Sequence, residues 1–132
     1  MKHLIVALPK IDELLADLAA SSPNYISSND FYKGYWSVRL SPETCHYTSF
    51  TDPKTGISYQ YSVLPMGRNV SAAAFALALG RVFQDKEYYH FLYTYVDDAS
   101  IVSKTIDEHL KHLKINFRTV RDNNLRLNFT KN

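Results

Sequence analysis

The sequence contains a single cysteine, Cys45, so it can form no disulfide within the chain and no cysteine-based zinc site. No apolar run approaches the roughly 20 residues of a membrane-spanning helix, and the apolar stretch from Leu4 to Leu8 is shorter than a signal-peptide core of about 7 to 15 residues. Only four glycines and five prolines occur among 132 residues, of which 45% are hydrophobic and 14% aromatic, and this composition excludes collagen-like and disordered chains. We therefore expect one folded domain or part of one, without a secretory signal or membrane contact, in the cytoplasm or nucleus.

The sequence also has little excess of either charge, because the formal net charge is only +2. The distribution is uneven, since residues 104–132 hold seven Lys or Arg against three Asp or Glu, a net +4, which leaves −2 for the rest. A basic C-terminal region suits contact with a polyanion, but it is equally typical of a solvated helix face.

Hydrophobic periodicity and turn residues divide the chain into helices and strands. The expected order is a helix beginning near Pro9 and ending at 21–23, a strand and turn followed by a strand or short helix within 25–40, a hairpin of strands 47–50 and 58–64, a helix capped by Ser71, a hairpin of strands 91–96 and 99–103, a helix opened by a capping box at Thr105–Glu108, and a strand at 125–129. On the last helix, we expect the apolar residues Leu110, Leu113, Phe117 and Val120 to share one face. We expect His109 and His112 to lie on the surface, since two imidazoles alone make a weak zinc site.

Two adjacent carboxylates, Asp97 and Asp98, fall at the expected tip of the second hairpin. Like charges at close range repel each other, and a bound divalent cation turns that repulsion into attraction. Taken alone, an Asp-Asp pair is also a common solvated turn. The residues around the pair favour the metal-binding interpretation.

Tyr95-Val96-Asp97-Asp98 resembles the YxDD signature of reverse transcriptases. Further blocks match the same family in order and spacing: 8–15, 30–36, 64–67, 103–110 and 125–128. Together they resemble the palm of reverse transcriptases from gypsy-type long-terminal-repeat retrotransposons, over nearly the whole chain. The resemblance implies an α+β fold in which helices pack on one face of an antiparallel sheet. It also implies a partial domain at 1–132, a palm with a remnant of the fingers and without thumb or ribonuclease H.

The chemistry that the resemblance implies is RNA-directed DNA polymerisation, the transfer of a deoxynucleotide from a dNTP to a primer 3′-hydroxyl. Two Mg²⁺ or Mn²⁺ ions would assist this transfer, and such hard cations take carboxylate oxygens as ligands. By resemblance, Asp30, Asp97 and Asp98 are both the catalytic and the metal-binding residues, with Asp30 brought to the hairpin tip by the fold. Without the family pattern, Asp30 would be interpreted as a turn or cap residue.

The same resemblance implies a nucleotide pocket formed by Phe31, Tyr35, Met66 and Gly67. The Tyr35 ring would exclude a 2′-hydroxyl and so favour deoxynucleotides, although a half-buried sheet aromatic explains it equally well. Met66 and Gly67 are also typical of residues that simply end a strand. The expected partners are an RNA or DNA template-primer, dNTP and the rest of a retroelement polyprotein.

Some positions depart from the family pattern. Arg68, Ala72 and Ala76 replace residues that are usually apolar, Pro and Gln, and Asn29 stands where Leu is typical, so that its amide needs a buried partner or costs stability. These departures keep open a second hypothesis, a catalytically inactive, domesticated or decayed palm that binds nucleic acid or protein. A third, another palm-like nucleotidyl transferase or cyclase, fits the block order less well. Lys10, Lys33 and Arg68 are either phosphate contacts or ordinary surface charges.

Overall fold

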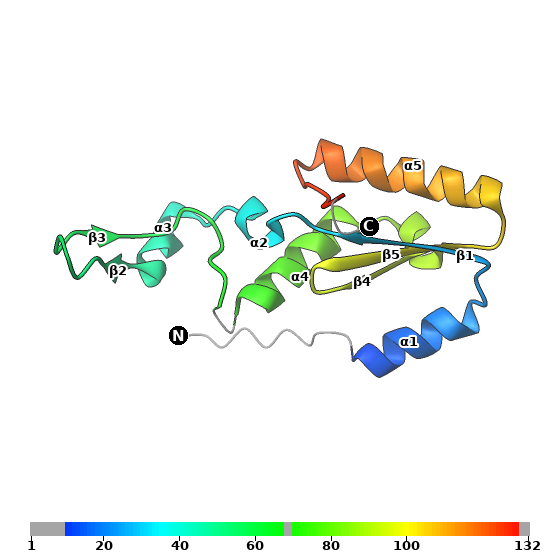
Figure 1. Ribbon diagram of the computed structural model, residues 1–132, viewed down its shortest axis with the longest axis horizontal. Helices are drawn as coiled ribbons and strands as arrows, with labels where there is room; N and C mark the ends of the chain where they lie inside the picture. The colour runs from blue at the N-terminus through cyan, green and yellow to red at the C-terminus, as the bar shows by residue number, and fades with distance from the viewer. Residues whose placement is uncertain (1–9, 68–69, 130–132) are drawn as a thin grey trace.

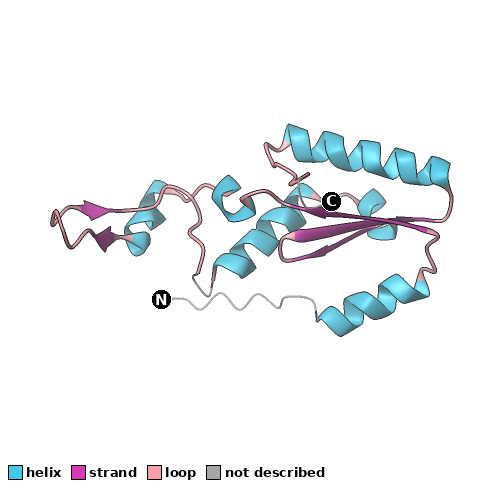
Figure 2. Cartoon of the chain, in the orientation of Figure 1, coloured by secondary structure: helices cyan, strands magenta, loops and turns pink. Residues whose placement is uncertain are grey.

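The computed structural model describes residues 10–67 and 70–129, which form a three-stranded antiparallel sheet, helices around it and a small hairpin at one end (Figures 1 and 2). The elements in chain order are α1 (Ile11–Ala20), β1 (Tyr25–Asp30), α2 (Gly34–Ser37), α3 (Pro42–Cys45), the 3-10 helix η1 (His46–Thr48), β2 (Phe50–Thr51), β3 (Ser58–Tyr59), α4 (Ser71–Val82), the 3-10 helix η2 (Lys86–His90), β4 (Leu92–Tyr95), β5 (Asp98–Ser103) and α5 (Ile106–Asp122). The expected α+β class with an antiparallel sheet is confirmed.

The sheet has the strand order β1-β5-β4, so β5 is its central strand. Tyr25 of β1 pairs with Ser103, and the register continues to Asp30 opposite Asp98. Because directly opposed residues of antiparallel strands point to the same face, Ala99 and Ile101 of β5 share a face with Asn29. All three are at most 4% exposed, so this face carries the core.

Two long helices contribute to that core. Phe75 and Leu79 of α4 and Val120 of α5 join Ala99 and Ile101 in one buried cluster. Figure 1 shows α1 on the side of the sheet opposite α5, and α1 contributes no buried residue. The expectation of helices on one face therefore holds for the helices that form the core. Within the described ranges, no helix combines the length and the apolar composition that crossing a membrane would require.

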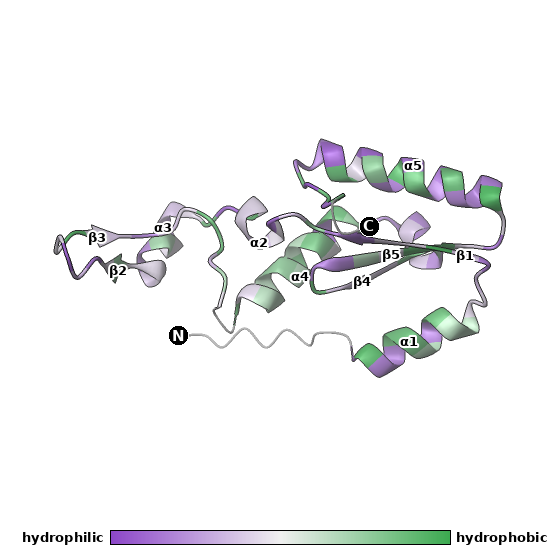
Figure 3. Ribbon diagram, in the orientation of Figure 1, coloured by the Kyte–Doolittle hydropathy of each residue, from purple (hydrophilic) through white to green (hydrophobic). Residues whose placement is uncertain are grey.

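Helix α5 begins with the expected capping box, in which the Thr105 side chain accepts the Glu108 N–H and the Glu108 carboxylate accepts the Thr105 N–H. Of its expected apolar residues, Val120 is buried and Leu113 packs against the core, whereas Leu110 and Phe117 are 58% and 41% exposed. His109 and Asn116 are the other buried residues of α5. Figure 3 shows both apolar and polar residues along this helix.

His109 is buried, contrary to the expected surface position, because β1 and β5 supply hydrogen-bond partners for its ring. Nε2 lies 2.7 Å from Ser27 Oγ and Nδ1 lies 2.9 Å from Ser103 Oγ. Ser103 Oγ also lies 2.7 Å from Nδ1 of His112, whose ring stacks on Phe91. Burial, and secondarily the neighbouring His112, lower the pKa of His109.

The remaining elements are shorter than expected. The first hairpin contains only the two-residue strands β2 and β3, and the expected strand at 125–129 is reduced to one bridge between Phe31 and Leu127. Helix α4 begins at Ser71 as expected, but the Ser71 hydroxyl donates to the Pro65 carbonyl instead of capping the helix. The expected start of the first helix at Pro9 lies outside the described residues.

Candidate active site

The tip of the β4–β5 hairpin is a two-residue loop. Tyr95 pairs with Asp98, so Val96 and Asp97 alone connect the strands. Val96 has a φ of +54°, a left-handed value that is uncommon for a β-branched residue and costs roughly 1–2 kcal/mol. Tight pairing of the flanking strands therefore holds Asp97 in the strained turn and Asp98 as the first residue of β5, so the turn lies one position earlier than the sequence predicts.

Asp30, 67 positions earlier in the chain, lies beside this tip. It is the last residue of β1 and stands directly opposite Asp98 in the antiparallel register. The next residue, Phe31, donates its N–H to the Asp97 carbonyl at 3.1 Å. Directly opposed Cβ atoms are about 4.5–5.5 Å apart and share one face of the sheet. The fold thus brings the three predicted aspartates together at one end of the sheet.

The acidic residues lie on the face away from the core. Asp98 is exposed and Asp30 is half-buried, whereas the neighbouring Asn29 and Ala99 point into the core. Like charges directly opposite each other are destabilising, and a divalent cation would relieve this. Their carboxylate oxygens are the donors that Mg²⁺ prefers. Among residues 10–67 and 70–129, however, no group of three or more His, Cys, Asp or Glu side chains is arranged to hold a metal ion.

Tyr35 in α2 lies close enough to Asp97 to sense its charge. Burial, and secondarily the negative charge of Asp97, raise the pKa of the Tyr35 hydroxyl. Its ring is half-buried and packs against Phe75, with 5.2 Å between the ring centroids. The structure therefore associates Tyr35 with the acidic residues, and its role in sugar selection stays a prediction.

The other three expected nucleotide contacts have different surroundings. Phe31 is 4% exposed and packs edge-on against Phe75, so its ring belongs to the core, and its contact with a nucleotide stays a prediction. Met66 is 66% exposed in the turn before α4, and Gly67 has a φ of +81° that suits glycine. A nucleotide contact at Met66 and Gly67 remains a prediction, and Arg68 lies outside the described residues.

One residue of the site was not assigned a role from the sequence. The Asn128 N–H donates to the Asp30 carbonyl at 2.8 Å, and its side-chain Nδ2 donates to Asp30 Oδ2 at 3.4 Å. Asn128 lies in the 125–128 block that resembles the family, which was the only signal in the sequence. This second segment fixes Asp30 from the side opposite β5.

The antiparallel sheet, with Asp97 at the hairpin tip and Asp30 opposite Asp98, is consistent with the polymerase palm that the resemblance implies. The family model described as reverse transcriptase (RNA-dependent DNA polymerase) matches residues 1–132. The chain belongs to this family.

Several known proteins resemble the chain. A putative enzymatic polyprotein of Cassava vein mosaic virus is 37% identical over 89 residues, which cover 67% of this chain and 13% of that protein. The retrovirus-related Pol polyprotein from transposon 297 of Drosophila melanogaster is 29% identical over 124 residues, 94% of this chain and 11% of that protein. An RNA-directed DNA polymerase homolog of Oenothera berteroana is 30% identical over 116 residues, 82% of this chain and 75% of that protein. The chain thus spans a small part of the polyproteins that it matches.

Proposed function

We propose that this chain is the palm of an RNA-directed DNA polymerase from a retrotransposon or related virus. It would transfer a deoxynucleotide from a dNTP to a primer 3′-hydroxyl paired with an RNA or DNA template. The observation that carries the proposal is the placement of Asp30 opposite Asp98, with Asp97 at the intervening hairpin tip. The chain spans 13% and 11% of the two polyproteins described above, and we expect weak polymerase activity or none from these 132 residues alone.

Asp30, Asp97 and Asp98 are the residues that would hold Mg²⁺ or Mn²⁺. Bound there, two such ions would activate the primer hydroxyl and neutralise charge on the phosphates of the nucleotide. Mg²⁺ keeps several waters and uses one or two carboxylates together with substrate phosphates, so a complete cage of protein ligands is not required. Asn128 would orient the Asp30 carboxylate, because it donates to one of its oxygens.

Tyr35 would select the sugar. Its ring packs on Phe75 beside the acidic end of the sheet, and substitution by a small residue would open space there. In a polymerase completed by its other subdomains, Tyr35→Ala would therefore raise incorporation of ribonucleotides relative to deoxynucleotides. Tyr35→Phe is the control, since it keeps the ring and should keep the preference.

The test of the site is metal binding by the chain itself. Mn²⁺ titrated by calorimetry should bind the wild type and bind Asp97→Asn at least about ten-fold more weakly, since the variant has one ligand charge fewer. Asp107→Asn is the matched control, because Asp107 is an exposed carboxylate in the first turn of α5. Equal binding by the wild type and Asp97→Asn would remove the metal site from the proposal.

A second candidate function is a non-catalytic palm that binds nucleic acid or protein. Buried amide atoms without a hydrogen-bond partner in the described part of the chain favour it: Asn29 Nδ2 and both polar side-chain atoms of Asn116. Such groups cost stability, so the fold carries polar atoms that its own contacts do not satisfy. Salt-sensitive binding of a primer-template that is unchanged by metal and by Asp97→Asn would support this candidate over the enzyme.

A further inference from the structure

A pocket lined by cationic and aromatic side chains opens at the end of β1. Its volume is about 350 Å³, and we call it the basic pocket. Three cations line it, Lys33, Arg39 and Arg126, together with the exposed rings of Tyr32 and Trp36. The rest of the lining consists of one hydroxyl and one amide side chain, so hydrogen-bond donors surround the space and no carboxylate does.

The three cations are not neutralised within the described ranges. The ion pairs there join Lys10 to Glu13 and Arg121 to Asp122, and neither pair involves the basic pocket. Cationic side chains that converge on one space repel each other, and an anion bound between them removes that repulsion. The charge of the pocket therefore indicates an anionic ligand.

Lys33 is held in position by the two aromatic rings. Its backbone is left-handed, with φ 51° and ψ 40°, immediately before α2. The Nζ atom lies 5.1 Å from the ring centroids of both Tyr32 and Trp36, which is within the range of a cation–π contact. A cation held in this way loses less side-chain conformational entropy when it binds an anion. The rings themselves are 43% and 47% exposed, and they offer surface to a base or sugar.

The backbone connects the basic pocket to the acidic end of the sheet. The Tyr32 N–H donates to the Arg126 carbonyl at 2.8 Å, while the Asn128 N–H donates to the Asp30 carbonyl. Tyr32 at the pocket is two positions from Asp30 at the candidate active site, and Arg126 is two positions from Asn128. Two positions are about 7 Å along an extended chain. The basic pocket and the acidic end of the sheet are therefore neighbouring parts of the same two segments.

We propose that the basic pocket binds the phosphate groups of a nucleotide or of a nucleic-acid strand whose reacting end lies at the aspartates. Lys33, Arg39 and Arg126 supply charge-assisted hydrogen bonds to the phosphate oxygens. The position of the reacting end rests on the proposed function. Phosphate binding itself does not, because the three cations need no metal to act.

The single tryptophan of the chain, Trp36, lines the pocket and reports on it directly. We would titrate the 132-residue chain with inorganic tripolyphosphate, dTTP and a thymidine oligonucleotide in a chelating buffer, and follow the Trp36 fluorescence. The double variant Arg39→Gln/Arg126→Gln should bind about 100-fold more weakly, about ten-fold for each charge-assisted hydrogen bond that it removes. Lys33→Gln should bind about ten-fold more weakly, and it serves as the second variant if the double variant fails to fold.

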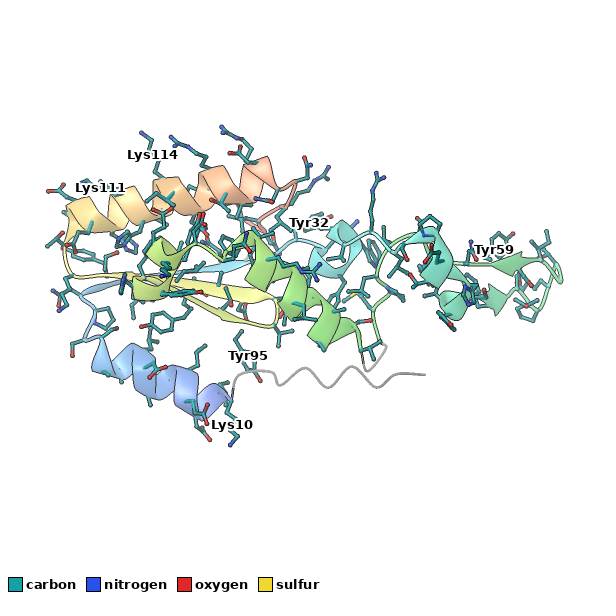
Figure 4. All side chains as sticks on the ribbon, turned by 180° about the vertical axis from the view of Figure 1, so that it is seen from behind. Lys10, Tyr32, Tyr59, Tyr95, Lys111 and Lys114 are labelled. Atoms are coloured by element: carbon teal, nitrogen blue, oxygen red, sulfur yellow. The ribbon has the colours of Figure 1, made fainter. Side chains whose placement is uncertain are left out.

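The matched control is Lys111→Gln/Lys114→Gln, which removes the same charge from α5. Figure 4 shows these two lysines on the side of α5 that faces away from the sheet, away from Tyr32, which lies near the opposite end of the helix. The control should leave binding unchanged. A saturable fluorescence change for tripolyphosphate and dTTP would assign the pocket to a nucleotide. Binding of the oligonucleotide alone would assign it to a strand, with a salt slope that falls by about 0.7 for each cation removed.

Two results would overturn the proposal: absence of binding by all three ligands, or an equal loss of affinity in the control and in the Arg39/Arg126 variant. The chelator makes these outcomes independent of the metal site. Failure here would leave the Mn²⁺ test of Asp97 standing, and loss of Mn²⁺ binding would leave the basic pocket standing.

Discussion

The contact between α2 and α4 provides the sharpest test of how the core supports Tyr35. A Cβ atom added at Gly34 would lie 2.6 Å from Phe75 Cζ, 3.1 Å from Phe75 Cε1 and 3.2 Å from Phe31 Cβ. Phe75 is fully buried and Phe31 is 4% exposed, so neither ring moves away into solvent. The change Gly34→Ala therefore forces a rearrangement inside a packed cluster.

The size of the effect follows from two opposing contributions. Overpacking of a core by a methyl group costs about 1–3 kcal/mol, and the gain from replacing a helical glycine with alanine returns up to about 1 kcal/mol. We expect Gly34→Ala to lower the free energy of unfolding by about 1–2 kcal/mol. For a chain of this size, that corresponds to a fall in melting temperature of about 3–10 °C.

The assay is thermal and urea unfolding, followed by circular dichroism. Gly80→Ala is the matched control, because it lies in α4, is exposed and has no atom within 4 Å of an added Cβ. It should raise the free energy of unfolding by about 0.5–1 kcal/mol through helix propensity alone. If Gly34→Ala stabilised the chain as Gly80→Ala does, the close packing of Gly34 on Phe75 would be refuted.

Further predictions concern buried polar groups. Asn29→Leu should raise the free energy of unfolding by about 1–2 kcal/mol, because it removes an amide Nδ2 that is buried without a hydrogen-bond partner. Urea unfolding measures this change, and a lower free energy of unfolding would show that the amide is satisfied. The His109 ring contacts Ser27 and Ser103 and lies beside His112 and Tyr25. Its pKa is lowered in the folded chain, so the unfolded chain binds a proton at this ring more readily. The free energy of unfolding should therefore be highest above about pH 6.5 and fall as the pH drops below it. His109→Gln should flatten this dependence in unfolding curves measured across that range.

Local sequence signals predicted the elements whose structure depends on neighbouring residues. The capping box at Thr105 needs only Glu108, and the hairpin around Asp97 needs only flanking β-formers and a turn. Both are present where they were expected. The alternation at 125–129 was also a local signal, but this segment forms an isolated bridge with Phe31 instead of a strand, since pairing depends on the neighbouring strand as well.

The buried face of α5 could not be predicted in this way. Apolar residues at 110, 113, 117 and 120 follow a helical period, and so do the residues at 109, 116 and 120 that are actually buried. The choice between the two faces depends on partners that are distant in sequence, such as Ser27 for His109. Tertiary contacts therefore decided in favour of a more polar face, and they left Leu110 and Phe117 exposed.

The site shows the same division. The pair Asp97 and Asp98 is adjacent in sequence, and the resemblance alone linked Asp30 to it. Asn128 and the basic pocket as a whole were not recognised, because Arg126 and Asn128 lie far from residues 30–39 in the sequence and backbone hydrogen bonds bring the two segments together.

The pairing of β1 with β5 has a consequence for how errors in folding would affect the chain. A shift of β1 by a single residue would exchange the two faces of the strand, so that Asn29 would take the position beside Asp98 and the Asp30 carboxylate would enter the apolar core. The same apolar contacts that make such a misaligned form unstable also keep the acidic residue outside. Correct alignment of one edge strand thus decides both whether the molecule is stable and whether it has a reactive centre.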